Sequence, residues 1–297
     1  MKTINNVLLC GLGAIGGYYA SKFVEHNIAL KVLVDKGRYE QYTKKPRVIN
    51  NVAYDFDYIL PEESGYVADL IIISTKSSGF AEAVKNIANF VGENTVILSF
   101  LNGITSELTI IERYGDKVLF SYLVGHTFFR KGDVINHDGN AKIVFGSDRQ
   151  SDSRVNLVSD IFDKLGVKYE VSDNIKKSQW EKFCFNCCVN QISALTRKTF
   201  GEMKKSDKCL NLMKHISDEI SKISQKENNF ETDFYKKTIE FLDLMIPNGK
   251  TSMLQDIENG KTPEVDLFGK TVTFLGGKHN IQTPYNKVIS EILDSLS

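Results

Sequence analysis

The sequence lacks net charge, long apolar stretches and an N-terminal targeting segment. Its 37 basic and 37 acidic residues cancel to a formal net charge of zero, whereas nucleic-acid-binding proteins typically carry a basic excess. No stretch approaches the roughly 18–20 apolar residues that span a bilayer. The first apolar run is short and lacks the cleavage site of a signal peptide. We therefore expect a cytoplasmic protein that binds neither nucleic acid nor membrane.

Cysteine and histidine are scarce. The five cysteines are an odd number, and a disulfide framework is not expected in a reducing compartment. Cys184 and Cys187 have C-x-x-C spacing, but neither a reactive thiol environment nor further ligands accompany them. We interpret these cysteines as small buried side chains on a helix. The five histidines are scattered along the chain, so the sequence predicts no metal site.

Short apolar runs alternate with helical patterns in the first half of the chain. The 297 residues are 42% hydrophobic and 25% charged, values typical of a globular protein, and the length favours two domains. The runs at residues 69–74 and 95–100 are nearly continuous, as in strands buried on both faces of a parallel sheet. We also expect strands at residues 7–10 and 30–34, and helices at residues 14–26 and 80–90. This alternation predicts a Rossmann-type, doubly wound α/β fold.

The pattern changes twice further along. Residues 118–124 and 141–145 favour strands, and the segment between them contains two turn clusters, so we expect additional sheet that closes the first domain. A helix at residues 154–165 and a strand at residues 168–171 complete it. Beyond about residue 172 the pattern is helical. The helices are expected at residues 180–195, 208–226, 234–244 and 283–296. We therefore predict a dinucleotide-binding domain over residues 1–172 and an all-helical substrate or dimerisation domain over residues 173–297.

A glycine motif joins the first predicted strand to the first helix. Gly11, Gly13 and Gly16 fit the pattern G-x-G-x-x-G. In such a motif the first glycine permits a tight turn, the second admits a pyrophosphate and the third allows close packing of helix on strand. The backbone N–H groups around Ala14 and Ile15 would face the phosphates. The motif predicts a dinucleotide site, and a glycine-rich turn without a ligand is the alternative.

Charged residues follow the second predicted strand. Asp35 stands 24 positions after Gly11, near where an acidic side chain binds the ribose 2′-hydroxyl of NAD. Lys36 and Arg38 come directly after it and could pair with the 2′-phosphate of NADP. All three could instead be solvated loop charges. We favour NADP as the cofactor and leave NAD open.

A polar stripe lies on a predicted helix of the second domain. Lys182, Asn186 and Asn190 are spaced at i, i+4 and i+8, which places them on one helix face. The neighbouring residues are aromatic, cysteine or valine, so the helix is expected to be buried. Buried amides and ammonium groups are costly unless they have a polar partner. The stripe therefore favours a ligand site over a solvated helix edge or amides satisfied by backbone.

A second polar cluster in this domain contains Ser252 and Glu264. Each has a structural interpretation: Ser252 could cap or precede a helix, and Pro263 suits a first helical position just before Glu264. Taken alone, Glu264 is more typical of an acidic residue at a helix start than of a catalytic one.

These motifs, taken in order, resemble the ketopantoate reductases (2-dehydropantoate 2-reductases). The resemblance extends nearly from end to end and depends on order and spacing more than on any single motif. Its elements are the glycine motif, Lys76 after an apolar strand, Asn102-Gly103 after the next strand, residues 132–139, the Lys182 helix, residues 252–256, residues 264–266 and Thr283-Pro284.

The resemblance implies reduction of 2-dehydropantoate to pantoate with NADPH, a step of pantothenate biosynthesis. It implies that Lys182 is the general acid, supported by Glu264, and that Lys76 and Asn102 lie beside the cofactor. It assigns substrate binding to a set of polar residues: Asn102, Asn186, Asn190, Ser252 and Glu264.

The chain departs from the family pattern at three positions. Leu101 replaces a glutamine and Pro263 replaces a threonine. Asp35 stands close to the position at which many members carry an arginine that binds the 2′-phosphate. These departures leave the cofactor and the exact substrate open, and Asp35 favours an NAD-dependent D-2-hydroxyacid dehydrogenase acting on another branched 2-keto acid. A non-catalytic dinucleotide sensor is the other alternative, and the retained Lys182, Asn186 and Asn190 argue against it, since a sensor needs no proton donor. A homodimer is also left open.

Overall fold

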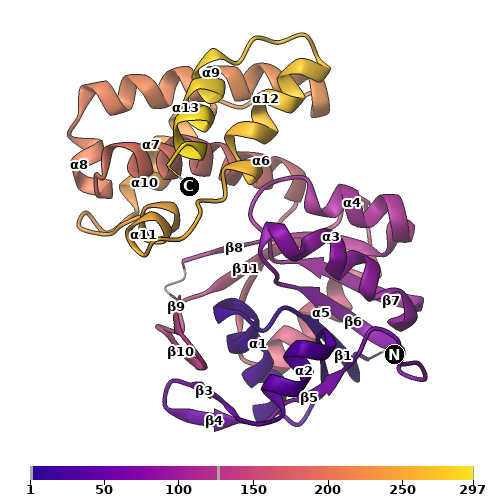
Figure 1. The fold of residues 1–297 in the computed structure, drawn as a ribbon. Helices are drawn as coiled ribbons and strands as arrows, with labels where there is room; N and C mark the ends of the chain where they lie inside the picture. Colours follow the sequence, from indigo (N-terminus) through magenta and orange to yellow (C-terminus); the bar gives the residue numbers. More distant parts are fainter. Residues whose placement is uncertain (1–2, 126–127, 297) are drawn as a thin grey trace. The chain divides into compact units, whose positions relative to one another are not determined.

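A computed structural model describes residues 3–125 and 128–296 (Figure 1). The chain divides into two compact units, residues 1–176 and residues 177–297. The first unit is α/β and the second is helical, as the sequence pattern predicted. The boundary expected from the sequence, after residue 172, falls just before α6 (Ile175–Phe185), the helix that crosses from one unit to the other.

The first unit is built on an eight-stranded sheet with strand order β12-β11-β8-β7-β6-β1-β2-β5 (Figure 1). All neighbouring strands run parallel except β8 and β11, which are antiparallel. The strands are β1 (Asn6–Cys10), β2 (Ala29–Leu33), β5 (Asp57–Ile59), β6 (Ala68–Ile73), β7 (Val91–Ser99), β8 (Val118–Val124), β11 (Lys142–Gly146) and β12 (Lys168–Val171).

Helices cover both faces of this sheet, which explains the nearly continuous apolar runs. In β1, Leu9 packs in a core with side chains of α1 and α5, while the neighbouring Leu8 packs in a separate core with α3 and α4. Successive side chains of a strand point to opposite faces, so a strand covered on both sides needs apolar residues at every position. The helices are α1 (Ala14–Glu25), α2 (Lys36–Tyr42), α3 (Ser77–Asn86), α4 (Ser106–Tyr114) and α5 (Ser153–Lys164).

The helix expected at residues 80–90 differs from the observed one. Helix α3 begins at Ser77 and ends at Asn86, and a 3₁₀ turn, Ala88–Phe90, follows it. A second 3₁₀ turn, Gly115–Lys117, precedes β8. The remaining predicted strands and helices of this unit agree with the structure to within a few residues at their ends.

A second sheet of four strands lies beside α1 and was not foreseen in this form. Its order is β4-β3-β10-β9, formed by β3 (Arg47–Ile49), β4 (Val52–Tyr54), β9 (Phe128–Lys131) and β10 (Val134–His137). The sequence predicted only turns around residues 132–139, yet two of these strands flank the turn. Strand β10 approaches α1 closely, because a Cβ atom at Gly17 would overlap the side chain of Ile135.

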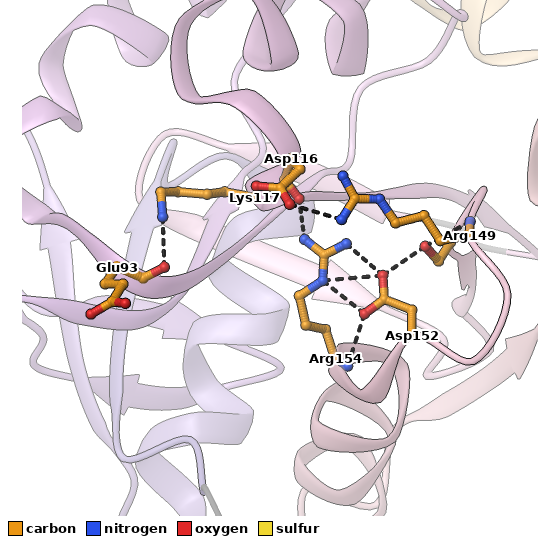
Figure 2. A network of polar contacts seen from close by, with 7 residues as sticks. Glu93, Asp116, Lys117, Arg149, Asp152 and Arg154 are labelled. Carbon is orange, nitrogen blue, oxygen red and sulfur yellow. Dashed lines mark hydrogen bonds and ion pairs between the residues drawn. The ribbon is translucent and has the colours of Figure 1, made fainter.

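A polar network joins the start of α5 to the loop before β8 (Figure 2). Asp152 caps α5 and accepts a hydrogen bond from the backbone N–H of Arg154. The Arg154 guanidinium pairs with the Asp152 carboxylate, holding its pKa well below the usual range, and also donates to the backbone carbonyl of Asp116. Arg149 pairs with the Asp116 carboxylate at 2.8 Å. These contacts tie the start of α5 to the segment that leads into β8.

The second unit contains no strand among its described residues. Its helices, after α6, are a π-helix (Asn186–Asn190), α7 (Gln191–Thr196), α8 (Phe200–Lys204), α9 (Asp207–Asn228), α10 (Phe234–Asp243), α11 (Ser252–Glu258), a 3₁₀ turn (Val265–Leu267), α12 (Gly269–Lys278) and α13 (Pro284–Asp294). Nowhere in residues 3–125 and 128–296 does a helix combine the length and hydropathy needed to cross a membrane.

Two expectations about helix starts in this unit need correction. Thr251 caps α11, because its side chain accepts a hydrogen bond from the backbone N–H of Leu254, so Ser252 is the first helical residue instead of the cap. Pro263 does not begin a helix, since the 3₁₀ turn starts at Val265. The proline at a first helical position is Pro284 in α13.

Candidate functional site

The glycine motif lies at the point where the order of the parallel sheet reverses. Strand β1 has β2 on one side and β6 on the other, and Cys10 pairs with Leu33 and with Ile73. Just beyond β6, the backbone N–H of Ser74 donates to the Cys10 carbonyl at 2.8 Å, and its hydroxyl donates to the Gly11 carbonyl at 2.8 Å. Ligands of open α/β sheets bind at such a reversal, outside the carboxyl ends of the strands.

The structure shows a different reason for glycine at each of the three positions of the motif. Gly11 has φ of +99°, and a Cβ there would lie 2.8 Å from backbone atoms of Ser74 and Thr75. A Cβ at Gly16 would overlap the Gly11 carbonyl oxygen, so only glycine lets α1 pack this closely on β1. Gly13 is different, because no atom lies within 4 Å of where its Cβ would stand. The space beside Gly13 is open for a ligand.

The residues around this space fit a dinucleotide. Gly13 occupies the N-cap position of α1, and no side chain caps this helix, so the N–H groups of its first turn, at Ala14 and Ile15, can donate to phosphate oxygens. The hydroxyl of Thr75, directly after β6, is buried without a hydrogen-bond partner in the part of the chain that the structure describes. A pyrophosphate suits this place. It would fill the free space beside Gly13 and accept hydrogen bonds from the Thr75 hydroxyl and from the uncapped start of α1.

Arg130 is a candidate that the sequence reasoning missed. Its guanidinium donates a 3.2 Å hydrogen bond to the carbonyl of Leu12, inside the glycine motif. The residue comes from β9, far away in the sequence, and no motif surrounds it. Its cationic side chain nevertheless lies at the loop that would hold the phosphates.

Two of the charged residues after β2, Asp35 and Arg38, contact one another at the start of α2. The Asp35 carboxylate caps α2 by accepting a hydrogen bond from the Arg38 backbone N–H at 2.7 Å. It also pairs with the Arg38 guanidinium at 3.0 Å, although both side chains remain exposed, at 46% and 65%. Lys36 is the first residue of α2 and is exposed. A carboxylate therefore occupies the end of β2, and Arg38 is held against it.

Lys76 and Asn102 follow the next two strands of the sheet. Lys76 is exposed and stands at the N-cap position of α3, immediately after β6. Asn102 is half-buried in the loop between β7 and α4, beside Gly103, whose φ is +100°. Because β1, β6 and β7 are parallel neighbours, both residues lie on the same edge of the sheet as the glycine motif. All the residues that the sequence predicted to bind the cofactor therefore follow strands at this one edge of the sheet.

In the second unit, Lys182 lies in the last turn of α6. Its side chain is half-buried, and its ammonium nitrogen lies 4.8 Å from the centre of the Phe185 ring. Burial lowers the pKa of Lys182 to about 8. Lysine normally titrates near pH 10.4, so this ammonium releases its proton far more readily than a solvated one.

Asn186 and Asn190 begin and end the π-helix that follows Lys182. Both are nearly buried, with exposed fractions of 3% and 6%. Neither side-chain amide makes a hydrogen bond to any described residue of the protein. Amides with little access to solvent gain from a polar partner, and π-helical turns occur frequently at functional sites. The two amides are therefore available to a polar ligand.

The π-helix also changes the expected arrangement of the stripe. The sequence predicted one regular α-helix over residues 180–195, with three side chains aligned by 3.6-residue periodicity. The structure inserts a wider turn between α6 and α7, so Asn190 is rotated relative to its place in a regular helix. Gln191, which no pattern indicated, donates from its side chain to the backbone carbonyl of Cys187 within this turn at 2.7 Å.

Ser252 and Glu264 lie on other segments of the second unit. Ser252 is the exposed first residue of α11, which packs against the π-helix and α7. Glu264 is half-buried and precedes the 3₁₀ turn. Lys182 forms no ion pair with Glu264 or with any other carboxylate of the described residues. Burial is the cause of the lowered pKa of Lys182, and support of the Lys182 charge by Glu264 stays a prediction.

The five cysteines are buried and unpaired. Cys184 and Cys188 have sulfur atoms 3.9 Å apart, and burial raises the pKa of the Cys187 and Cys188 thiols. Thiols that resist ionisation are poor nucleophiles and poor metal ligands. In residues 3–125 and 128–296, no group of three or more potential metal ligands is present.

The two halves of the chain match two family models. Residues 7–150 match the model described as ketopantoate reductase PanE/ApbA, and residues 174–297 match the corresponding C-terminal model. The chain belongs to the ketopantoate reductase family. It is therefore an oxidoreductase of a dinucleotide-binding family. A 2-dehydropantoate 2-reductase of Aquifex aeolicus is 26% identical over 96% of this chain and 95% of that protein.

Solved structures show the same fold at lower identity. A D-mandelate dehydrogenase bound to NADH and anilino(oxo)acetate superposes with a TM-score of 0.88, at 20% identity, over 98% of this chain and 97% of that chain. A dimeric ketopantoate reductase from Staphylococcus aureus has a TM-score of 0.77, at 20% identity, over 98% of both chains. At these identities the likeness shows the fold alone.

Proposed function

We propose that this protein reduces a small 2-keto acid, with 2-dehydropantoate as substrate and NADPH as cofactor, yielding pantoate for pantothenate biosynthesis. One observation carries the proposal. Lys182, with a lowered pKa, is followed by two buried amides, Asn186 and Asn190, that have no partner among the described residues. A proton donor beside unpaired amide groups suits a keto acid, whose carbonyl needs a proton and whose carboxylate needs donors.

Lys182 provides the proton in this mechanism. When bound, the reduced nicotinamide supplies the hydride. The carbonyl oxygen gains negative charge as hydride reaches its carbon, and a positioned cation stabilises that charge as it develops. With a pKa of about 8, Lys182 is mostly protonated at neutral pH and yet releases its proton without a large penalty. It can therefore polarise the carbonyl and then protonate the oxygen.

The remaining polar residues would orient the substrate. The amides of Asn186 and Asn190 can donate to the substrate carboxylate, and the hydroxyl of Ser252 can bind it as well. Glu264 can accept a hydrogen bond from a substrate hydroxyl, which 2-dehydropantoate possesses. The glycine motif, Lys76 and Asn102 would hold and orient the dinucleotide. These assignments follow the family resemblance, residue by residue.

A second candidate is an NADH-dependent D-2-hydroxyacid dehydrogenase acting on another branched 2-keto acid. The observation that favours it is Asp35, whose exposed carboxylate stands at the end of β2 and pairs with Arg38. A carboxylate accepts hydrogen bonds from a ribose 2′-hydroxyl and repels a 2′-phosphate. The similar D-mandelate dehydrogenase was also solved with NADH. The chemistry at Lys182 would be the same.

Steady-state kinetics separates the two candidates. 2-Dehydropantoate with NADPH is compared with a panel of branched 2-keto acids with NADH, and kcat/KM is measured for each pair. The proposal expects the highest value for 2-dehydropantoate with NADPH. A higher value for another keto acid with NADH would establish the second candidate. Absence of turnover with every pair, together with tight dinucleotide binding, would indicate a sensor and overturn both.

We also propose that the protein forms a homodimer, as the similar reductase from Staphylococcus aureus does. The helical unit would supply the interface.

A further inference from the structure

Two hydrogen bonds hold the guanidinium of Arg130 at the glycine motif. Its Nε atom donates to the Gly132 carbonyl of its own hairpin at 3.0 Å, and its Nη1 atom donates to the Leu12 carbonyl at 3.2 Å. A guanidinium has five N–H donors in one plane, and the other donors of Arg130 form no hydrogen bond with a residue that the structure describes. They are therefore available beside the loop that joins β1 to α1.

The pairing of β9 with β10 explains why this side chain faces α1. Arg130 stands opposite Ile135 in the antiparallel register, and residues paired in this way point to the same face of a sheet. On that face the Ile135 side chain packs against Gly17 of α1. Two positions before Arg130 in β9, the ring of Phe128 lies 5.6 Å from the ring of Tyr18 in α1, measured between their centres. The small sheet is thus fixed on α1 with Arg130 on the side of the glycine motif.

The charge of Arg130 has no neighbouring carboxylate to balance it. Within residues 3–125 and 128–296, Arg130 takes part in no ion pair. The acidic residue nearest to it in the sequence, Asp133, pairs with Arg47 instead. A cation left without a carboxylate beside an open loop is free to bind an anionic ligand.

The N-terminus of α1 adds positive charge at the same place. The aligned peptide dipoles of a helix put a partial positive charge at its N-terminus, where acidic side chains are favourable and basic ones are not. The first turn of α1 contains no acidic residue. Arg130 is nevertheless held against Leu12, directly before the N-cap residue Gly13. A bound anion would offset the repulsion between these two positive groups.

The pyrophosphate of a dinucleotide is the anion that fits this place. In a Rossmann fold the pyrophosphate binds at the glycine motif, whereas the ribose that carries the 2′-phosphate of NADP lies near the end of the second strand. Arg130 contacts the motif, and Asp35 and Arg38 stand at the end of β2. A guanidinium can also donate two parallel hydrogen bonds to phosphate oxygens.

We propose that Arg130 binds the pyrophosphate of the dinucleotide, so that the small sheet contributes a phosphate-binding residue to the site formed by β1 and α1. Arg130 then adds equally to the affinity for NADH and for NADPH and does not distinguish between them. This inference rests on the dinucleotide binding of the proposed function, and it is independent of which keto acid is reduced.

Removal of the guanidinium tests the contact. Arg130→Met keeps much of the side-chain length but has neither donor nor charge. The dissociation constants of NADPH and NADH, from fluorescence titration, should therefore both rise by about tenfold or more, and by the same factor. Arg130→Lys keeps the charge without the planar fork, so its loss of affinity should be smaller. Arg113→Met, at an exposed arginine in the last turn of α4, is the matched control and should leave both constants unchanged.

Two fragments of the cofactor identify the group that Arg130 binds. ADP contains a pyrophosphate, and adenosine 2′-monophosphate has the 2′-phosphate without a pyrophosphate. Their dissociation constants are measured by displacement of bound NADPH. Arg130→Met should weaken ADP binding by about tenfold and leave adenosine 2′-monophosphate within about twofold of wild type. The affinity for ADP should also depend less steeply on salt in Arg130→Met, because salt screens a charge pair that the variant lacks.

The outcomes separate this inference from the proposed function. Unchanged dissociation constants in Arg130→Met would overturn the inference, and so would a loss for NADPH alone, which would assign Arg130 to the 2′-phosphate. Weaker ADP binding with an unchanged salt dependence would mean that Arg130 only fastens β9 to the glycine motif. Circular dichroism checks the fold of each variant, and Arg130→Lys carries the test if Arg130→Met does not fold. A wild-type protein that binds neither NADPH nor NADH would overturn the proposed function itself.

Discussion

The side chain of Gln191 donates a 2.7 Å hydrogen bond to the backbone carbonyl of Cys187, within the π-helix that carries Asn186. The same amide group lies 3.4 Å from the Oδ1 atom of Asn286, whose own amide donates to Glu219 at 2.8 Å. Glu219 also accepts the backbone N–H groups at the start of α13. Buried polar groups of α9 and α13 therefore hold the π-helical turn in place.

Gln191 should act as a positioning residue for substrate binding. Gln191→Met keeps the approximate length but removes the donor, so a buried carbonyl loses its partner and the free energy of unfolding should fall by about 1–3 kcal/mol. Because the turn then relaxes, KM for the keto acid should rise several-fold while cofactor affinity is retained. Thermal unfolding and steady-state kinetics check this, with exposed Gln282→Met as the control. If stability falls but KM is unchanged, Gln191 stabilises the fold and does not position the substrate-binding residues.

The buried amides should matter for the keto acid and not for the cofactor. In Asn186→Ala and Asn190→Ala a donor to the substrate is lost, so kcat/KM for the keto acid should fall by about tenfold or more. Ser252→Ala should have a smaller effect in the same direction. Dinucleotide affinity, measured by fluorescence titration, should stay within about twofold of wild type, because the glycine motif belongs to the other unit. Equal losses of affinity for the keto acid and for the dinucleotide would contradict the assignment of these residues to the keto acid alone.

Asp35 should control the choice between the two dinucleotides. Asparagine is as good an N-cap as aspartate, so Asp35→Asn retains the start of α2 while it removes the charge that holds Arg38. The freed guanidinium could then pair with a 2′-phosphate. We expect NADPH to be preferred by the wild type, and the ratio of kcat/KM for NADPH over NADH to rise by about tenfold in the variant. A ratio that falls or stays constant would show that Asp35 does not face the ribose.

Much of the α/β unit could be predicted because its signals are local. The strand at residues 69–74 is recognisable from one apolar run, since burial on both faces demands it. The glycine motif likewise follows from adjacent residues, and Gly11 and Gly16 have the tight contacts that the motif implies. The small sheet could not be predicted in the same way. Strands β3 and β10 pair across a long stretch of sequence, and neither has a pattern that marks its partner.

The site in the helical unit was predictable in composition but not in geometry. Lys182, Asn186 and Asn190 could be named from spacing, yet the π-helix between them depends on contacts from Gln191, Asn286 and Glu219. Glu219 and Asn286 are distant from the π-helix in sequence, and all three look like ordinary polar residues of a helix. The lowered pKa of Lys182 also follows from tertiary burial, which no local pattern reports.

The pH dependence of reduction should follow the titration of Lys182. Its pKa of about 8 lies below the ordinary lysine value, and only the protonated form can act as the acid. Activity should therefore be constant below pH 8 and fall above it, approaching a tenfold loss in kcat/KM for each further pH unit. A profile that stays flat up to pH 10 would mean that another group supplies the proton.

Single-turnover hydride transfer by Lys182→Ala tests the central claim most directly. The variant should fold and bind the dinucleotide, because the substitution removes a partly exposed side chain and leaves the glycine motif intact. If Lys182 protonates the carbonyl oxygen, the rate at which reduced-nicotinamide absorbance is lost should fall by about 10²–10⁴-fold, the usual contribution of a positioned acid. A rate within about threefold of wild type would contradict the mechanism.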